Sequence, residues 1–290
     1  MQRVLITGAT GNVGLGMIKH LTRLQLPVRI VAGVRDVEKA RQVFKDFPEL
    51  EFVRFDFEQP ATFKEALNSI DRVFLLRPPH IAKIKKYFTP LFVEMQNQQV
   101  NQVLFLSVQG AEKSKVIPHH KIEQSIKAFG FDYIFLRPGY FMQNLTTTLL
   151  HDIKQKQQIV LPAGHAKFNW IDVENIGEVA AILLHQFGDY KNSVYEITGY
   201  ENEDFHTVSR IISDITNVPI TFKNVNPLRF YRFKRRMGMP KGKVLVMMML
   251  HFLPRFQSAP HISDFYEQLT NKAPTSLKTF VARERVHFTP

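Results

Sequence analysis

The residues with the clearest chemical potential are three glycines near the N-terminus. The apolar run 4–6 is of strand type, and Gly8, Gly11 and Gly14 follow it before a helical pattern begins. A pyrophosphate needs a tight turn, a closely approaching backbone and helix N-terminal amides aimed at the anion. The alternative is an ordinary strand–helix connection, but this context favours dinucleotide binding. The residues that we expect to contact the dinucleotide are Gly8, Thr10, Gly11, Asn12, Val13 and Gly14.

Further candidates follow the other apolar runs that we interpret as strands. Arg35 stands where NAD enzymes often carry an acid for the ribose hydroxyls, and a cation there suits a 2′-phosphate. NADP(H) is therefore favoured over NAD(H), with Asp36 as either a competing acid or a helix N-cap. Every other candidate could instead be a loop residue or helix cap; these are Asp56, Leu76, Arg77, Pro78, Ser107 and Val108.

These candidates are positioned by an alternation of strand and helix patterns. Strands are predicted over residues 4–6, 28–34, 51–55, 72–76, 102–106 and 133–136, with helices between them. This alternation predicts an α/β fold with a doubly wound, parallel Rossmann sheet, whose ligands bind outside the carboxyl ends of the strands.

The alternation loosens beyond residue 137. We expect residues 1–150 to form an NAD(P)-binding Rossmann domain. Residues 151–290 are expected to form a smaller, mainly helical substrate cap interleaved with the sheet. The elements predicted in this half are helices over 140–153, 175–184 and 205–215, and strands over 158–161, 168–173, 194–197 and 220–222.

Composition narrows the class of protein. The chain has 290 residues, of which 44% are hydrophobic, and no apolar run reaches the roughly 18 residues of a membrane-spanning helix. Cysteine is absent, which excludes disulfides, thiolate chemistry and Cys-type zinc sites. We expect a cytoplasmic protein without a signal peptide or bound metal; the oligomeric state is left open.

The net charge of +12 is concentrated in one stretch. Residues 215–263 contain no Asp or Glu, and the cations of this stretch lie between residues 223 and 255. The first interpretation is a solvated basic helix followed by a core helix. The second is a peripheral surface that meets anionic lipid and admits a lipophilic substrate. Nucleic acid binding is the least favoured, because no DNA-binding motif accompanies the charge.

Longer motifs resemble those of the atypical short-chain dehydrogenases/reductases of the NmrA-like group, which includes NAD(P)H:quinone reductase-like proteins. The resemblance covers residues 1–215 and implies a Rossmann fold, bound NADP(H), and either reductase or redox-sensing activity. Tyr140 and Asn144 are then expected to shape the nicotinamide and substrate pocket. The matching segments are 8–14 (GATGNVG), 119–123 (HHKIE), 136–144 (LRPGYFMQN), 170–173 (WIDV) and Ile176-Gly177.

One departure from the larger family concerns the proton donor. No tyrosine here has a lysine four residues later, so the usual Tyr-x-x-x-Lys pair is absent. His119 falls where related reductases carry Lys or His, and Glu123 follows at i+4 on the same helix face. This pair could deliver a proton to a carbonyl or quinone oxygen. The alternatives are an ordinary solvent-facing pair, or His120 in the same role.

Two functions remain open. The first is an NADPH-dependent reductase of a small quinone or carbonyl compound, supported by the His–Glu pair and the methionine-rich run 244–250. The second is a non-catalytic protein that senses NADP(H), supported by the missing Tyr-x-x-x-Lys pair. The fold alone does not choose between them.

Overall fold

The computed structural model describes residues 2–115 and 117–289. They divide into two units, each of which is formed by two separate stretches of the chain. The first unit comprises the described residues up to 138 together with residues 173–197, and the second comprises residues 139–172 and 198–289. Residues 139–150 thus belong to the second unit, while 173–197 return to the first. Each unit is described by itself.

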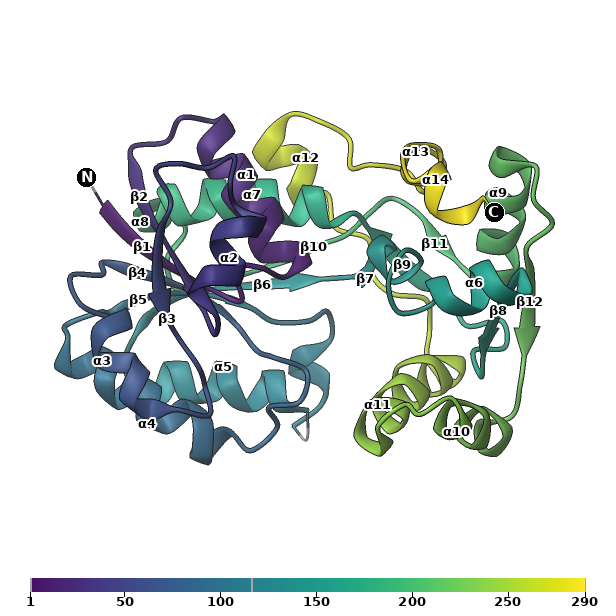
Figure 1. The fold of residues 1–290 in the computed structure, drawn as a ribbon, viewed down its shortest axis with the longest axis horizontal. Helices are drawn as coiled ribbons and strands as arrows, with labels where there is room; N and C mark the ends of the chain where they lie inside the picture. The colour runs from purple at the N-terminus through teal and green to yellow at the C-terminus, as the bar shows by residue number, and fades with distance from the viewer. Residues whose placement is uncertain (1, 116, 290) are drawn as a thin grey trace. The chain divides into compact units, whose positions relative to one another are not determined.

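A seven-stranded parallel sheet forms the centre of the first unit (Figure 1). Its order is β10-β6-β5-β4-β1-β2-β3, so the order reverses at β1, as in a doubly wound Rossmann sheet. The predicted fold class is confirmed. The strands are β1 (Gln2–Thr7), β2 (Val28–Val34), β3 (Glu51–Arg54), β4 (Arg72–Leu76), β5 (Gln102–Leu106), β6 (Asp132–Pro138) and β10 (Ser193–Ile197).

Helices cover both faces of this sheet, with α1 and α7 on one face and α3, α4 and α5 on the other (Figure 1). Parallel strands buried on both faces read as continuous apolar runs, which explains why the sequence placed six of the seven in one parallel sheet. The helices are α1 (Asn12–Arg23), α2 (Val37–Val43), α3 (Phe63–Ala66), α4 (Ile84–Asn97), α5 (Pro118–Ala128), α7 (Val173–His185) and α8 (Phe187–Tyr190), with 3₁₀ turns η1 (Pro60–Thr62) and η2 (Ala111–Lys113).

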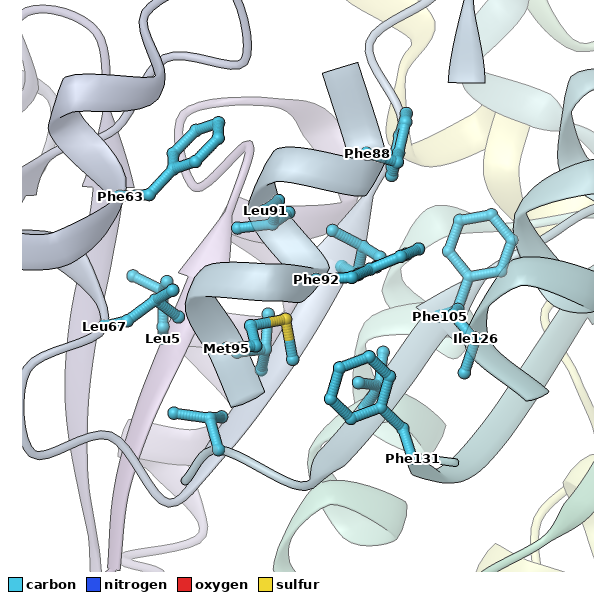
Figure 2. Packing of buried hydrophobic residues seen from close by; sticks show 14 of the residues in the cluster. Leu5, Phe63, Leu67, Phe88, Leu91, Phe92, Met95, Phe105, Ile126 and Phe131 are labelled. Atoms are coloured by element: carbon cyan, nitrogen blue, oxygen red, sulfur yellow. The ribbon is translucent and has the colours of Figure 1, made fainter. Parts of the chain in front are cut away.

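The buried apolar and aromatic side chains of α4 pack against one face of the sheet. Figure 2 shows Phe88, Leu91, Phe92 and Met95 of this helix above the strands, together with Phe105 of β5. All five side chains are fully buried. Removing one such ring costs about 3–5 kcal/mol, so this core fixes the strands whose ends carry the candidate residues.

The opposite face is held by the pair α1 and α7. A Cβ added at Gly177 would lie 2.7 Å from the carbonyl carbon of Gly16, so the two helices approach at glycines. Arg72, at the start of β4, donates to the carbonyls of Leu184 (2.5 Å) and His185 (2.9 Å) at the end of α7. These contacts explain why residues 173–185 belong to the Rossmann unit.

The second unit is built from small sheets and short helices. Its strands form the sheets β11-β9-β7 and β12-β8. Its elements are β7 (Tyr140–Phe141), α6 (Leu150–Lys156), β8 (Gln158–Leu161), β9 (Phe168–Ile171), β11 (Asn202–Glu203), α9 (Phe205–Thr216), β12 (Thr221–Asn224), α10 (Pro227–Arg236), α11 (Lys241–Phe252), α12 (Phe265–Thr270), α13 (Leu277–Arg283) and α14 (Arg285–Phe288), with 3₁₀ turns η3 (Met142–Asn144) and η4 (Leu253–Phe256).

One predicted helix differs from the structure, and one predicted strand joins a sheet that the sequence did not assign it to. The helix expected over 140–153 begins only at Leu150, because Tyr140–Phe141 pairs with β9 as the strand β7. The strand expected at 194–197 forms the seventh strand of the Rossmann sheet, parallel to β6. In the described part of the chain, no helix combines the length and apolarity needed to cross a membrane.

Candidate functional site

The glycine turn lies at the carboxyl end of β1, where the strand order reverses. Gly8 has a φ of +65°, a left-handed conformation that favours glycine. Its carbonyl accepts a hydrogen bond from the Gly11 amide at 2.9 Å. A Cβ on Gly14 would lie 2.5 Å from the Gly8 carbonyl oxygen, so only glycine allows α1 to start this close to β1. Gly8 therefore makes the tight turn after β1, and Gly14 lets α1 pack closely against it.

The N-terminus of α1 is open to an anion. Gly11 is the N-cap and supplies no side-chain cap, and the first turn holds no acid. Thr10, Gly11 and Asn12 are exposed, while Val13 is buried beneath them. The first amides of a helix have no partner within it and carry partial positive charge. These residues therefore fit a pyrophosphate, and a side chain at Gly11 would project into the space that the anion needs.

The charge at the end of β2 comes from Arg35. Its side chain is exposed, and no ion pair joins it to any residue that the structure describes. Asp36 is instead the N-cap of α2: its carboxylate accepts from the Lys39 amide at 3.1 Å, and this bond lowers the pKa of Asp36. The helix-cap interpretation of Asp36 is confirmed, so Arg35 is the free charged group of this dipeptide.

Two other candidates serve local structure. Asp56 accepts from the Glu58 amide at 2.9 Å, so its carboxylate stabilises the turn after β3. The Leu76 amide donates to the Thr7 hydroxyl at 2.9 Å, and that hydroxyl donates to the Phe74 carbonyl. Thr7 thus joins the carboxyl ends of β1 and β4, and the Leu76 side chain packs against Gly8.

A buried ionic network connects the ends of β5 and β6 to α5. The Ser107 hydroxyl donates to Glu123 Oε1 at 2.6 Å, and Arg137 donates to both carboxylate oxygens at 3.0 and 2.7 Å. Glu112 binds the same guanidinium at 2.6 Å. The side chain of Glu123 is only 2% exposed. Glu123 is therefore a structural clamp for the loop that carries Ser107 and Val108, and it is not a solvent-facing residue.

His119 lies on the same helix but has a different partner. Arg77 Nε donates to His119 Nε2 at 3.4 Å, while Arg77 Nη1 binds the carbonyls of Pro78, Pro79 and Ile81 at 3.1, 3.1 and 2.8 Å. Among the described residues, no hydrogen bond joins His119 to Glu123, whose carboxylate accepts from Arg137 and Ser107. The loop after β4 supplies the partner instead.

This environment keeps His119 neutral. Burial lowers the pKa of His119 to about 3, and the positive charge of Arg77 acts in the same direction. A general acid works best with a pKa near the operating pH. His119 is therefore poorly suited to donate a proton at neutral pH. With Nε2 accepting from Arg77, the ring proton is on Nδ1. His120 donates its Nδ1 proton to the Ala111 carbonyl at 3.1 Å.

Tyr140 and Asn144 belong to the second unit. His251 Nδ1 lies 2.6 Å from the Met247 carbonyl, which can only accept, so His251 Nε2 accepts the Tyr140 hydroxyl proton at 2.9 Å. Burial raises the pKa of Tyr140, and a hydrogen bond from Asn144 opposes this shift. Burial lowers the pKa of His251 to about 4, and Lys234 adds to this effect.

The sequence reasoning missed two site residues. Arg137 directly follows an apolar run within a motif already singled out, so its position at a strand end could have identified it. His251 gave no local signal, because its partner lies 111 residues away in the chain.

The reversal of strand order at β1, the glycine turn and the uncapped helix define a dinucleotide-binding protein of the Rossmann class. The model of the NmrA-like family matches residues 1–264, and the chain belongs to that family. Prestalk A differentiation protein A of Dictyostelium discoideum is 29% identical over 96% of this chain and 90% of its own length. The NAD(P)H azoreductase of Xenophilus azovorans is 24% identical over 98% and 97%.

A solved structure has the same fold. The NADPH-dependent quinone oxidoreductase of Escherichia coli, in complex with NADPH, superposes with a TM-score of 0.84 at 18% identity, covering 97% of this chain and 99% of the other. These relatives include a differentiation protein and two named oxidoreductases, so membership of the family does not by itself assign an activity.

Proposed function

We propose that the protein is an NADPH-dependent reductase of small, electron-poor acceptors, with quinones as the favoured class. The observation that carries the proposal is the exposed, uncapped glycine turn at the carboxyl edge of the parallel sheet. This is where open α/β sheets bind their ligands. The names of the azoreductase and of the quinone oxidoreductase support the same class of chemistry.

The first unit supplies the groups that would hold the nucleotide. The α1 amides and Gly11 bind the pyrophosphate, and Arg35 binds the ribose 2′-phosphate. Asp56, Leu76, Arg77, Pro78, Ser107 and Val108 follow neighbouring strands and border the rest of the molecule at the same edge. Tyr140 and Asn144 stay proposed contacts of the nicotinamide. Bound NADPH supplies the hydride, and the protein supplies orientation and electrostatics.

The protonation state of His119 favours some hydride acceptors over others. Reduction of a ketone needs a proton at the oxygen that receives charge, and the pKa of His119, near 3, makes it a poor donor. A quinone that accepts hydride becomes a stabilised hydroquinone anion and takes its proton from water. The reaction balances as two electrons and one proton from NADPH, with the second proton from solvent. Quinone-like acceptors therefore suit this site better than simple carbonyl compounds.

The alternative is a non-catalytic NADP(H) sensor. One observation favours it: the described contacts leave no group near His119 that would keep it protonated at neutral pH. The two functions share the nucleotide site and differ in whether NADPH is oxidised. Nucleotide binding is therefore tested first, and turnover separately.

Substitution of Gly11 tests the pyrophosphate site. Gly11 is extended, with φ −81° and ψ 168°, and its Cβ would lie 3.2 Å from the Gly8 carbonyl oxygen, which must move by a few tenths of an ångström to accept it. We expect Gly11→Val to unfold at the wild-type temperature and to bind NADPH at least about tenfold more weakly in calorimetric titration. Wild-type affinity in Gly11→Val would place the phosphates elsewhere.

Substitution of Arg35 tests the choice of nucleotide. We expect wild-type protein to bind NADPH more tightly than NADH, because a charge-assisted bond to the 2′-phosphate contributes about 1.5–3 kcal/mol. Arg35→Ala should weaken NADPH binding by about tenfold or more and leave NADH nearly unchanged. Arg41→Ala, an exposed cation within α2, is the matched control. Equal affinities for the two nucleotides in the wild type contradict the assignment.

A further inference from the structure

We propose that the second unit carries a docking surface for anionic membranes, formed by the exposed apolar face of α11 and η4. This surface, which we call the α11 face, consists of Val246, Met249, Leu250, Leu253 and Phe256. The proposal is independent of the nucleotide site and of turnover.

The α11 face is a helical stripe. Val246, Met249, Leu250 and Leu253 are spaced i, i+3, i+4 and i+7, which places them on one side of the helix. Their exposed fractions are 46%, 52%, 56% and 47%. Phe256 in η4 is 74% exposed and contacts the ring of Phe252 edge-on, at 5.3 Å between centroids. Contiguous exposed apolar residues of this kind mark an interaction site.

The core of the unit uses the other side of the same helix. Val244, Met247 and His251 are buried. His251 accepts the Tyr140 hydroxyl proton and donates its own ring proton to the Met247 carbonyl. The helix is therefore anchored by one apolar stripe and presents a second. The interpretation of this stretch as a core helix holds for only one face of α11, because the other face is exposed.

The charge around this face is uniformly positive. Residues 215–263 hold nine cations and no acid. Lys234 is withdrawn from the surface, since it is buried against Asp152. None of the other cations is ion-paired with a residue that the structure describes. They are exposed at Lys223, Arg229, Arg232, Arg235, Arg236, Lys241, Lys243 and Arg255.

The cations adjoin the stripe directly. Lys243 lies one turn before Val246 on the same side of α11, and Arg255 lies between Leu253 and Phe256, with its guanidinium over Phe252. The basic helix α10 packs against α11 (Figure 1). An apolar helix face bordered by Lys and Arg is the pattern of helices that lie in a lipid interface.

The positive charge around the α11 face favours an anionic lipid surface over a second copy of this chain or a nucleic acid. In an isologous dimer each α11 face would meet the same cations on its partner, and like charges would repel. Nucleic acid would be attracted by the cations but gains little from Leu250, Leu253 or Phe256. An anionic lipid surface matches both features, because headgroups neutralise the cations while the acyl boundary accepts the apolar stripe.

Co-sedimentation with vesicles tests the proposal. We expect the full-length protein to bind vesicles of equal parts phosphatidylcholine and phosphatidylglycerol at least about tenfold more tightly than phosphatidylcholine alone, because each surface cation contributes roughly fivefold. The triple variant Leu250→Ser, Leu253→Ser, Phe256→Ser should bind at least about tenfold more weakly. The triple variant Lys241→Gln, Lys243→Gln, Arg255→Gln should lose a similar factor.

Matched controls come from exposed residues of the first unit. Val43→Ser with Val93→Ser removes apolar groups that are 51% and 45% exposed, and Lys45→Gln, Lys64→Gln, Lys85→Gln removes the same charge. These controls should bind like the wild type, and all variants should keep the wild-type unfolding temperature. Three results overturn the proposal: no vesicle binding, equal loss in the controls, or wild-type dimerisation that the apolar triple variant abolishes.

Discussion

At the scale of single residues, the candidate site separates a buried carboxylate from a half-buried imidazole. Glu123 is paired with Arg137 and Ser107, and His119 receives a hydrogen bond from Arg77. Breaking such a buried ion pair by removing one partner is strongly destabilising, so Glu123 contributes to the stability of the fold. The imidazole, without a carboxylate and beside a cation, remains neutral.

The lowered pKa of His119 predicts a measurable acid sensitivity. An unfolded His119 has a pKa near 6.5, whereas burial lowers the folded value to about 3. Between these values the unfolded chain binds a proton that the folded chain does not, so stability is lost as the pH falls below about 6.5. Between pH 7.5 and 5 this effect amounts to at most about 2 kcal/mol.

Urea unfolding at both pH values measures this effect. We expect His119→Gln to lose less stability on acidification than the wild type, because glutamine does not titrate. His151→Gln, at an exposed position, should keep the wild-type difference. An unchanged pH dependence in His119→Gln would show that the imidazole titrates normally in the fold.

The residue types at the site were readable from the sequence, but their pairing was not. The spacing of His119 and Glu123 correctly placed both on one helix. The competing partner Arg137 comes from β6, and Arg77 comes from the loop after β4. Periodicity along one helix carries no information about which side chains neighbouring strands bring to it.

At the scale of elements, Arg72 couples the sheet to α7. Its guanidinium bonds the last carbonyls of α7, lies 5.5 Å from the Phe187 ring and is 6% exposed. The C-terminal end of a helix leaves carbonyls without hydrogen-bond partners, and a cation there also interacts favourably with the negative end of the helix dipole. One side chain thus holds the segment that returns from the second unit.

Replacing Arg72 should weaken the first unit. We predict that Arg72→Met lowers the free energy of unfolding by about 2–3 kcal/mol, since it leaves buried carbonyls without donors. Arg29→Met, at an exposed position on β2, should stay within about 0.5 kcal/mol. Chemical denaturation compares the two. Equal stabilities would mean that α7 is held by packing alone.

Elements of the first half were predicted more accurately than those of the second. The predicted bounds of β2, β4 and β5 agree with the structure, because strands buried on both faces appear as uninterrupted apolar runs. Tyr140 and Phe141 resembled the start of a helix, yet pairing with β9 makes them a strand. The partner strand is about thirty residues later, so local propensity could not reveal it.

At the scale of the whole molecule, the sequence order hides the organisation of the chain. Residues 173–197 lie between the two segments of the second unit in the sequence but complete the Rossmann sheet with α7 and β10. The contacts that explain this return are long-range, such as Gly16 with Gly177 and Arg72 with His185. The amino-acid composition does not change where the chain enters or leaves residues 173–197.

The proposed activity is tested most directly by NADPH oxidation, followed through the loss of reduced-nicotinamide absorbance, with a benzoquinone or a simple ketone as acceptor. We predict turnover with the quinone at a rate well above that with the ketone. His119→Gln should keep quinone turnover within about threefold, far from the 10²–10⁴-fold loss of a missing general acid. Gly11→Val should be inactive. Tight NADPH binding without oxidation by either acceptor, or faster turnover of the ketone, would contradict the account.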